Sequence, residues 1–192
     1  MAKKCLIVYP FFAHYRLHII EEIFKSNLDW DFELVGDPIT TGGIKGIDSN
    51  LANKDIAKGG VNWTFTPLLY PFGRDNPLCW QSGLIKRLFR KDYDLVIMLG
   101  SIYYISYLFA VPILKLLKVP IVFWTHGFLG KDNYLISLIR HIFYSQANAL
   151  LLYGNRAKKI MEKTNFYKNT SLYVINNSLD YSDLDLIKFD TG

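Results

Sequence analysis

The strongest constraint on the fold of this chain is a set of short segments that are apolar at every position instead of at alternate positions. The clearest is 95–99, with the sequence LVIML. A strand of this composition is covered on both faces, which is typical of a parallel sheet with helices on each side. Seven segments are predicted as strands: 4–9, 32–36, 63–68, 94–99, 121–124, 149–153 and 171–175.

Amphipathic helical patterns separate these strands. Leu17, Ile20 and Phe24 share one helical face. The most complete stripe, with spacings i, i+3, i+4, i+7 and i+8, consists of Leu135, Leu138, Ile139, Ile142 and Phe143. Its predicted cap is Asp132 or Asn133, and Asn155 is the predicted cap of a later helix that ends near residue 163.

The alternation of strands and helices predicts an α/β fold with right-handed crossovers. We expect a single Rossmann-like, doubly wound, mostly parallel sheet of about seven strands. The glycine-rich segment between the second and third strands is predicted to be a long loop or short helices. The apolar range 102–124 fits a core helix followed by a buried strand better than a membrane span, because Pro112, Lys115, Lys118 and Pro120 interrupt it.

Composition narrows the function classes. A chain of 192 residues with 51% hydrophobic residues is expected to be one folded domain. The net charge of +5 is dispersed and accompanies no recognition motif, so no nucleic-acid partner is predicted. Cys5 and Cys79 are too few for a disulfide framework or a metal cluster, and they favour a reducing, cytoplasmic setting. Pro10 and His14 interrupt the N-terminal apolar run, which argues against a secretory signal.

In an open parallel sheet, ligands bind where strands end and helices begin. The segment 10–16 after the first strand contains no glycine, which excludes a dinucleotide fingerprint. It contains His14, Tyr15 and Arg16. A cation is unfavourable in the first turn of a helix, so Arg16 indicates an anionic ligand or a carboxylate across the cleft; an ordinary surface arginine is the alternative.

The later strand ends supply further candidates. Gly100 would let the backbone approach a ligand, and Ser101 is either a binding residue or a helix cap. His126, followed by Gly127, is placed to offer an imidazole to a substrate, and a structural histidine is the alternative. Gly154 and Asn155 follow the sixth strand.

A helix predicted over 84–91 separates apolar from basic residues. Its apolar side contains Leu84, Ile85, Leu88 and Phe89. Its basic side consists of Lys86, Arg87, Arg90 and Lys91. Such a face would attract an anionic membrane surface, but an ordinary solvated face, with the apolar side of the helix on the sheet, is the favoured interpretation.

Taken in order, these marks resemble glycosyltransferase family 4, whose members have the two-domain GT-B fold. The resemblance is carried by Tyr15-Arg16, Trp124-Thr125-His126-Gly127, Ala147-Asn148-Ala149, Leu150-Leu151-Leu152-Tyr153-Gly154 and Val174-Ile175-Asn176-Asn177-Ser178-Leu179-Asp180. The last stretch is similar to the family's I-P-N-G-x-D, which closes the N-terminal domain. The resemblance implies an acceptor-side domain over 1–180 and, over 181–192, the start of a crossing to a nucleotide-sugar domain outside this sequence.

The resemblance further implies metal-independent, retaining transfer of a sugar from a nucleotide-sugar co-substrate, with no cofactor. The acceptor would be a carbohydrate or lipid-linked molecule in cell-surface polysaccharide or glycolipid synthesis. The enzyme would then work in the cytoplasm, at the inner face of the membrane. His126 would be the catalytic residue. Substrate binding would fall to His14, Tyr15, Arg16, Gly100, Ser101, Gly127, Gly154 and Asn155.

Several positions depart from the family pattern. The glycine-rich turn after the first strand is replaced by Phe11-Phe12-Ala13-His14, and the usual acidic residue before the sixth strand is Asn148. The paired glutamates that accompany the nucleotide diphosphate are not in these 192 residues. This chain alone is therefore expected to be inactive. Two other functions stay open: a non-catalytic Rossmann-like binding subunit and a GT-B nucleotide-sugar epimerase.

Overall fold

The computed structural model describes residues 2–26, 29–40, 43–55, 59–89, 92–128 and 133–175. The main sheet consists of β1 (Lys3–Phe11), β2 (Trp30–Asp37), β3 (Trp63–Phe65), β6 (Leu95–Leu99), β7 (Ile121–Thr125), β8 (Ala149–Leu152) and β9 (Ser171–Val174). The helices are α1 (Leu17–Lys25), α2 (Leu84–Leu88), α3 (Ile105–Leu116), α4 (Tyr134–Tyr144) and α5 (Asn155–Glu162). The 3-10 helices include η1 (His14–Arg16), η2 (Ser49–Asn53) and η4 (Asn165–Tyr167).

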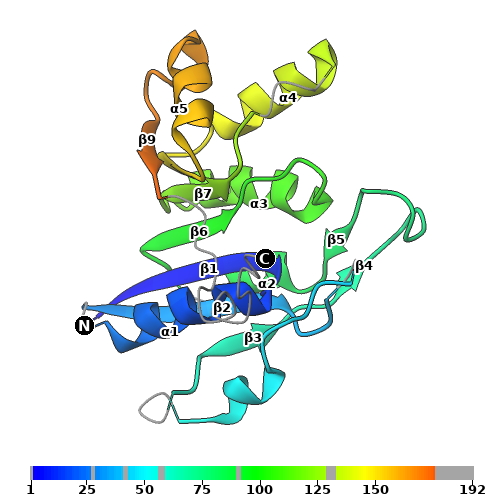
Figure 1. Ribbon diagram of the computed structural model, residues 1–192, viewed down its shortest axis with the longest axis vertical. Helices are drawn as coiled ribbons and strands as arrows, with labels where there is room; N and C mark the ends of the chain where they lie inside the picture. Colours follow the sequence, from blue (N-terminus) through cyan, green and yellow to red (C-terminus); the bar gives the residue numbers. More distant parts are fainter. Residues whose placement is uncertain are drawn as a thin grey trace, which may run out of the picture.

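The seven strands are all parallel and lie in the order β3-β2-β1-β6-β7-β8-β9 (Figure 1). This confirms the predicted Rossmann-like α/β sheet and all seven predicted strands. The chain moves outward from β1 in one direction through β2 and β3, and from β6 in the other direction through β7, β8 and β9. The strand order therefore reverses between β1 and β6, and a ligand crevice is expected beside that switch point.

The two faces of the sheet have separate cores. On one face, α2, α3, α4 and α5 pack over side chains such as Met98, Phe123 and Leu150. On the other face, α1 and η2 pack over side chains such as Ile7 and Leu34, and Trp124 belongs to this second core. Figure 1 shows α1 lying across β1 and β2. Because successive residues of a strand alternate in direction, Phe123 and Trp124 serve opposite faces.

A small hairpin was not predicted. The third predicted strand ends early, at Phe65, and the chain then forms β4 (Leu68–Leu69), which pairs antiparallel with β5 (Trp80–Gln81). Gln81 fixes this hairpin to the main sheet. Its fully buried amide donates to the Tyr9 carbonyl oxygen at 3.0 Å and to Thr66 Oγ1 at 2.7 Å, and it accepts from the Tyr107 hydroxyl at 2.8 Å. Two-residue strands leave no periodicity that a sequence pattern would detect.

The helix α4 is confirmed, but much of its apolar stripe is exposed. Leu135, Ile139 and Ile142 are 63%, 43% and 51% exposed, whereas Phe143 is buried and stacks on Phe123 with ring centroids 4.6 Å apart. The helix meets the sheet at its C-terminal end and extends away from it (Figure 1). The predicted cap is confirmed for Asn133, whose Oδ1 accepts from the Ile136 amide at 2.9 Å; position 132 lies outside the described residues.

The helix α2 is shorter than predicted, and Arg87, one residue of its basic side, is held by other side chains. Arg87 is half-buried and forms an ion pair with the buried Glu33, and its Nε donates to the Tyr93 hydroxyl at 3.1 Å. Lys86 is exposed, and Phe89, predicted on the apolar side, is exposed as well. Positions 90 and 91 lie outside the described residues, so the membrane surface predicted from Lys86, Arg87, Arg90 and Lys91 loses Arg87.

The remaining segments follow their predictions. The range 102–124 forms α3 and β7, with Pro112 inside the helix. No helix among the described residues is long and apolar enough to span a membrane. The loop between β2 and β3 contains η2. Cys5 and Cys79 are buried free thiols, and burial raises their pKa values to about 12 and about 11, so both are inert.

Candidate functional site

Arg16 is the centre of a cluster of aromatic side chains at the carboxyl edge of the sheet. It is only 8% exposed, although it is the last residue of η1, directly before α1. Its Cζ atom lies 4.8 Å from the ring centroid of Tyr9 and 4.6 Å from that of Trp124. The rings of Tyr15 and Tyr153 follow at 5.6 Å each. The alternative of a surface arginine is therefore wrong, because this guanidinium is buried among four rings.

The buried guanidinium has no carboxylate partner among the residues that the structure describes. Its Nη2 atom donates a hydrogen bond to the Tyr153 hydroxyl. Cation–π attraction to tyrosine and tryptophan offsets about 0.5–2 kcal/mol of the desolvation cost per ring. A buried charge without a counter-ion is nevertheless unfavourable. An arrangement of this kind suits a site that receives an anion.

Trp124 contributes a second unusual group to this cluster. The residue is 8% exposed, and its indole N–H has no hydrogen-bond partner among the described residues. A buried donor without an acceptor costs about 1–3 kcal/mol. The ring packs edge-to-face against Tyr9, with centroids 5.6 Å apart. The indole and the guanidinium belong to one cluster, because Arg16 Cζ lies 4.6 Å from the Trp124 ring centroid.

His126 lies immediately after β7, at the carboxyl edge, and is exposed. The location expected from the sequence is therefore confirmed. Its ring lies 4.3 Å from the ring of Tyr153, centroid to centroid, so it borders the cluster around Arg16. Partial burial lowers the pKa of His126, and the positive charge of Arg16 lowers it further. The imidazole is consequently neutral at pH 7, with one nitrogen able to donate and the other to accept.

We predict that Arg16→Gln raises the pKa of His126, because it removes a positive charge that opposes protonation. In the unaltered protein the pKa lies below the usual 6.5, so the folded state binds this proton less well than the unfolded chain. The associated stability is complete above pH 6.5 and is lost as the pH falls through the folded-state value. An NMR titration of the imidazole C–H signals measures the His126 pKa in the unaltered protein and in the variant. An unchanged His126 pKa in the variant would show that the two groups do not interact.

The two glycines at the strand ends have structural roles. A Cβ on Gly100 would lie 2.9 Å from the Cβ of Thr125, and the Gly100 carbonyl oxygen accepts from Thr125 Oγ1 at 3.1 Å. Gly127 is buried with a positive φ of 69°, and a Cβ there would lie 2.9 Å from the Cβ of Ala157 in α5. Protein atoms therefore fill the space beside both glycines, and close approach of a ligand does not explain them.

The other predicted site residues are held in different ways. The His14 ring donates from Nδ1 to the Lys45 carbonyl oxygen at 3.0 Å, which ties η1 to the following loop. Tyr15 lies beside both His14 and Arg16. Ser101 does not cap α3, since its Oγ accepts from the Tyr103 amide at 3.4 Å and the helix begins at residue 105.

The predicted cap of α5 is also wrong. Gly154 occupies the N-cap position, and Asn155 is the first residue of the helix and makes no capping bond. A Cβ on Gly154 would meet nothing within 4 Å. Gly154 and Asn155 follow Tyr153 along the chain.

The sequence analysis did not predict that Tyr9, Trp124 and Tyr153 contact the Arg16 guanidinium. Each lies within two residues of the carboxyl end of its own strand, β1, β7 or β8. All three belong to the core on the α1 face. An aromatic residue at the same end and on the same face of several strands is a signal that the sequence did contain.

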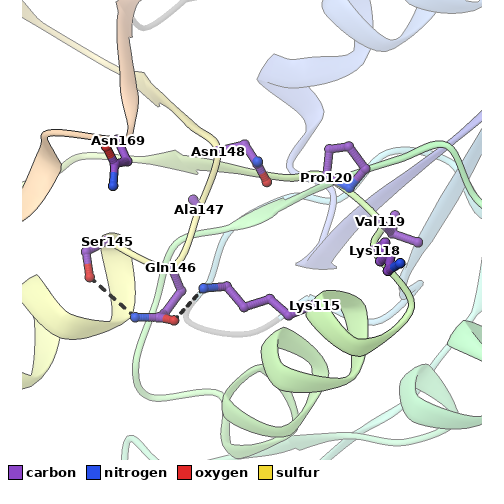
Figure 2. Close-up of a pocket in the computed structure, with 9 residues that line it drawn as sticks. All are labelled: Lys115, Lys118, Val119, Pro120, Ser145, Gln146, Ala147, Asn148 and Asn169. Atoms are coloured by element: carbon purple, nitrogen blue, oxygen red, sulfur yellow. Dashed lines mark hydrogen bonds between the residues drawn. The ribbon is translucent and has the colours of Figure 1, made fainter.

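A cavity of about 380 Å³ lies at the opposite, amino edge of the sheet (Figure 2). It is lined by Lys115, Lys118, Val119, Pro120, Ser145, Gln146, Ala147, Asn148 and Asn169. Lys115 Nζ donates to Gln146 Oε1 at 2.6 Å, and Asn148 Oδ1 accepts from the Ile121 amide at 2.9 Å. A carboxylate oxygen at this position would accept the same bond. The cavity contains none of the predicted site residues.

The fold and the site define a Rossmann-like α/β domain with a candidate binding site at the carboxyl edge of its sheet. Comparison of the chain with models of known protein families and with curated proteins finds no match. No group of histidine, cysteine, aspartate or glutamate side chains suited to a metal ion occurs in the part of the chain that the structure describes.

Proposed function

We propose that this chain is the acceptor-side domain of a GT-B glycosyltransferase that transfers a sugar from a nucleotide-sugar donor with retention of configuration. The observation that carries the proposal is the placement of His126. It is an exposed, neutral imidazole at the carboxyl edge of a parallel sheet, next to a buried cation. Family resemblance suggests that this histidine approaches the donor sugar.

In this proposal His126 forms a hydrogen bond with the donor sugar and fixes its orientation. A hydrogen-bonding side chain that is already in place stabilises the charge that develops in the transition state without the cost of reorganising water. The ring of Tyr153 limits the movement of the imidazole from one side. The Gly127 amide donates to Thr125 Oγ1 at 3.2 Å, which fixes the backbone directly after His126.

The acceptor in this proposal is a carbohydrate or a lipid-linked molecule, used in cell-surface polysaccharide or glycolipid synthesis. The work would take place in the cytoplasm, at the inner membrane face. Exposed apolar side chains on α4 and the exposed Lys86 are compatible with such a location. The nucleotide would be held by a second Rossmann-like domain, as in other GT-B enzymes.

We predict that these 192 residues alone bind UDP-glucose and GDP-mannose only weakly, with Kd values above about 1 mM, which corresponds to about −4 kcal/mol. The reason is that the proposed diphosphate-holding groups belong to the other domain. Isothermal titration calorimetry measures the affinity directly. A micromolar Kd for either nucleotide sugar would contradict the placement of this domain on the acceptor side.

A non-catalytic binding subunit is the second candidate function. Arg16 favours it, because a buried guanidinium among aromatic rings can bind an anion without catalysing a reaction. An epimerase has less support, since among the described residues Arg16 is the charged side chain that shifts the pKa of His126, and no carboxylate does so. An acid/base pair of the kind an epimerase needs would include such a group. Sugar transfer that depends on His126 would distinguish the enzyme from the binding subunit.

A further inference from the structure

We propose that Arg16 and Trp124 bind a phosphate-type oxyanion carried by the acceptor substrate; the assignment to the acceptor rests on the proposed function. The first observation is the guanidinium itself, which has five N–H donors. Among the described residues, the only side-chain hydrogen bond from Arg16 goes to the Tyr153 hydroxyl. Its other donors are therefore available, and its charge is unmatched by any described carboxylate.

The second observation is independent of the first. The indole N–H of Trp124 is buried and has no acceptor among the residues that the structure describes. The guanidinium lies over this ring, with Cζ 4.6 Å from the centroid. The guanidinium and the indole have only hydrogen-bond donors and no acceptor atoms. A ligand that bonds to both side chains must therefore supply acceptor atoms.

The third observation is the start of α1. Arg16 is the N-cap residue of this nine-residue helix, no side chain caps it, and the first turn contains no acidic residue. The N-terminal end of a helix carries partial positive charge and is favourable for anions. The Leu17 amide already donates to the His14 carbonyl oxygen, so the helix contributes a field that favours negative charge, and the guanidinium and the indole N–H contribute the donors.

A phosphate group fits this preference better than a carboxylate. It carries more negative charge at pH 7, and its terminal oxygens point in several directions, so that separate donors are satisfied at once. In the proposed enzyme the donor diphosphate belongs to the second domain. The oxyanion beside Arg16 is then the phosphate or diphosphate of the acceptor.

The test is an NMR titration of the isotope-labelled chain with inorganic pyrophosphate. The chain has 4 tryptophans, and Trp124→Phe identifies the indole signal of Trp124 by its disappearance. We expect pyrophosphate to shift that signal together with the amide signals at the start of α1. Arg16→Gln should weaken pyrophosphate binding about tenfold or more, while the matched change Arg74→Gln, at an exposed arginine in the β4–β5 hairpin, should leave it unchanged.

The outcomes separate the possible ligands. Signals at the cluster that do not move with pyrophosphate in the unaltered chain, or equal binding by Arg16→Gln, would overturn the oxyanion site. Acetate that binds as tightly as pyrophosphate would overturn the choice of phosphate. UDP that binds through Arg16 about a hundredfold more tightly than pyrophosphate would assign the site to the donor. Failure of sugar transfer with intact pyrophosphate binding would instead refute the proposed enzyme and leave the oxyanion site standing.

Discussion

Replacement of His126 by alanine in the native full-length protein is expected to lower kcat about 100- to 1,000-fold. The variant would lose a preorganised hydrogen bond to the reacting sugar, and such bonds contribute about 2.7–4 kcal/mol to transition-state stabilisation. Because His126 is exposed, the free energy of unfolding should change by less than about 0.5 kcal/mol. Steady-state release of nucleoside diphosphate and urea denaturation measure the two quantities.

The control is Lys159→Ala, which truncates an exposed side chain on α5. It should leave both kcat and stability nearly unchanged. Full activity in His126→Ala would remove this residue from the mechanism. An inactive variant that is also unfolded would show that His126 is a structural residue, which was the alternative that the sequence left open.

The second large effect concerns stability. Replacement of Phe123 by alanine is expected to lower the free energy of unfolding by about 3–5 kcal/mol. Phe123 is fully buried in β7 and stacks on Phe143, with ring centroids 4.6 Å apart, so its loss leaves a cavity between the sheet and α4. The free energy of unfolding of a domain is typically about 5–15 kcal/mol, so this loss is a substantial fraction of it. Urea denaturation with a linear extrapolation measures the change.

Leu135→Ala is the control for this experiment. Leu135 lies on the same helix as Phe143 but is 63% exposed, and we expect a change of less than about 0.5 kcal/mol. The sequence pattern places the two residues on one apolar stripe, so only their different burial separates the two expected losses. A large loss for Leu135→Ala would show that this part of α4 is covered in solution.

The sheet was predictable because its strands are covered on both faces, and continuous apolar runs such as 95–99 reveal this directly. The burial of α4 was not predictable in the same way. Periodicity identifies the apolar side of a helix, but it does not show how much of the helix contacts the sheet. The contact is confined to the end that contains Phe143 and Tyr144.

The candidate site was predictable only in part. Ligands bind at the carboxyl ends of parallel strands, and His126 follows the end of one predicted strand. The end of that single strand was therefore enough to select it. The burial of Arg16 depends on residues from several strands. Tyr153, which accepts its hydrogen bond, is 137 residues further along the chain. No local pattern around Arg16 contains that contact.

Sugar transfer by the native full-length protein tests the central claim most directly. The measurement is incubation with a panel of UDP- and GDP-sugars and a membrane-lipid or polysaccharide acceptor, followed by assay of nucleoside diphosphate and NMR of the new glycosidic bond. We predict acceptor-dependent release with the anomeric configuration of the donor retained. Transfer with inverted configuration, or no acceptor-dependent release from any sugar of the panel, would contradict the proposed function.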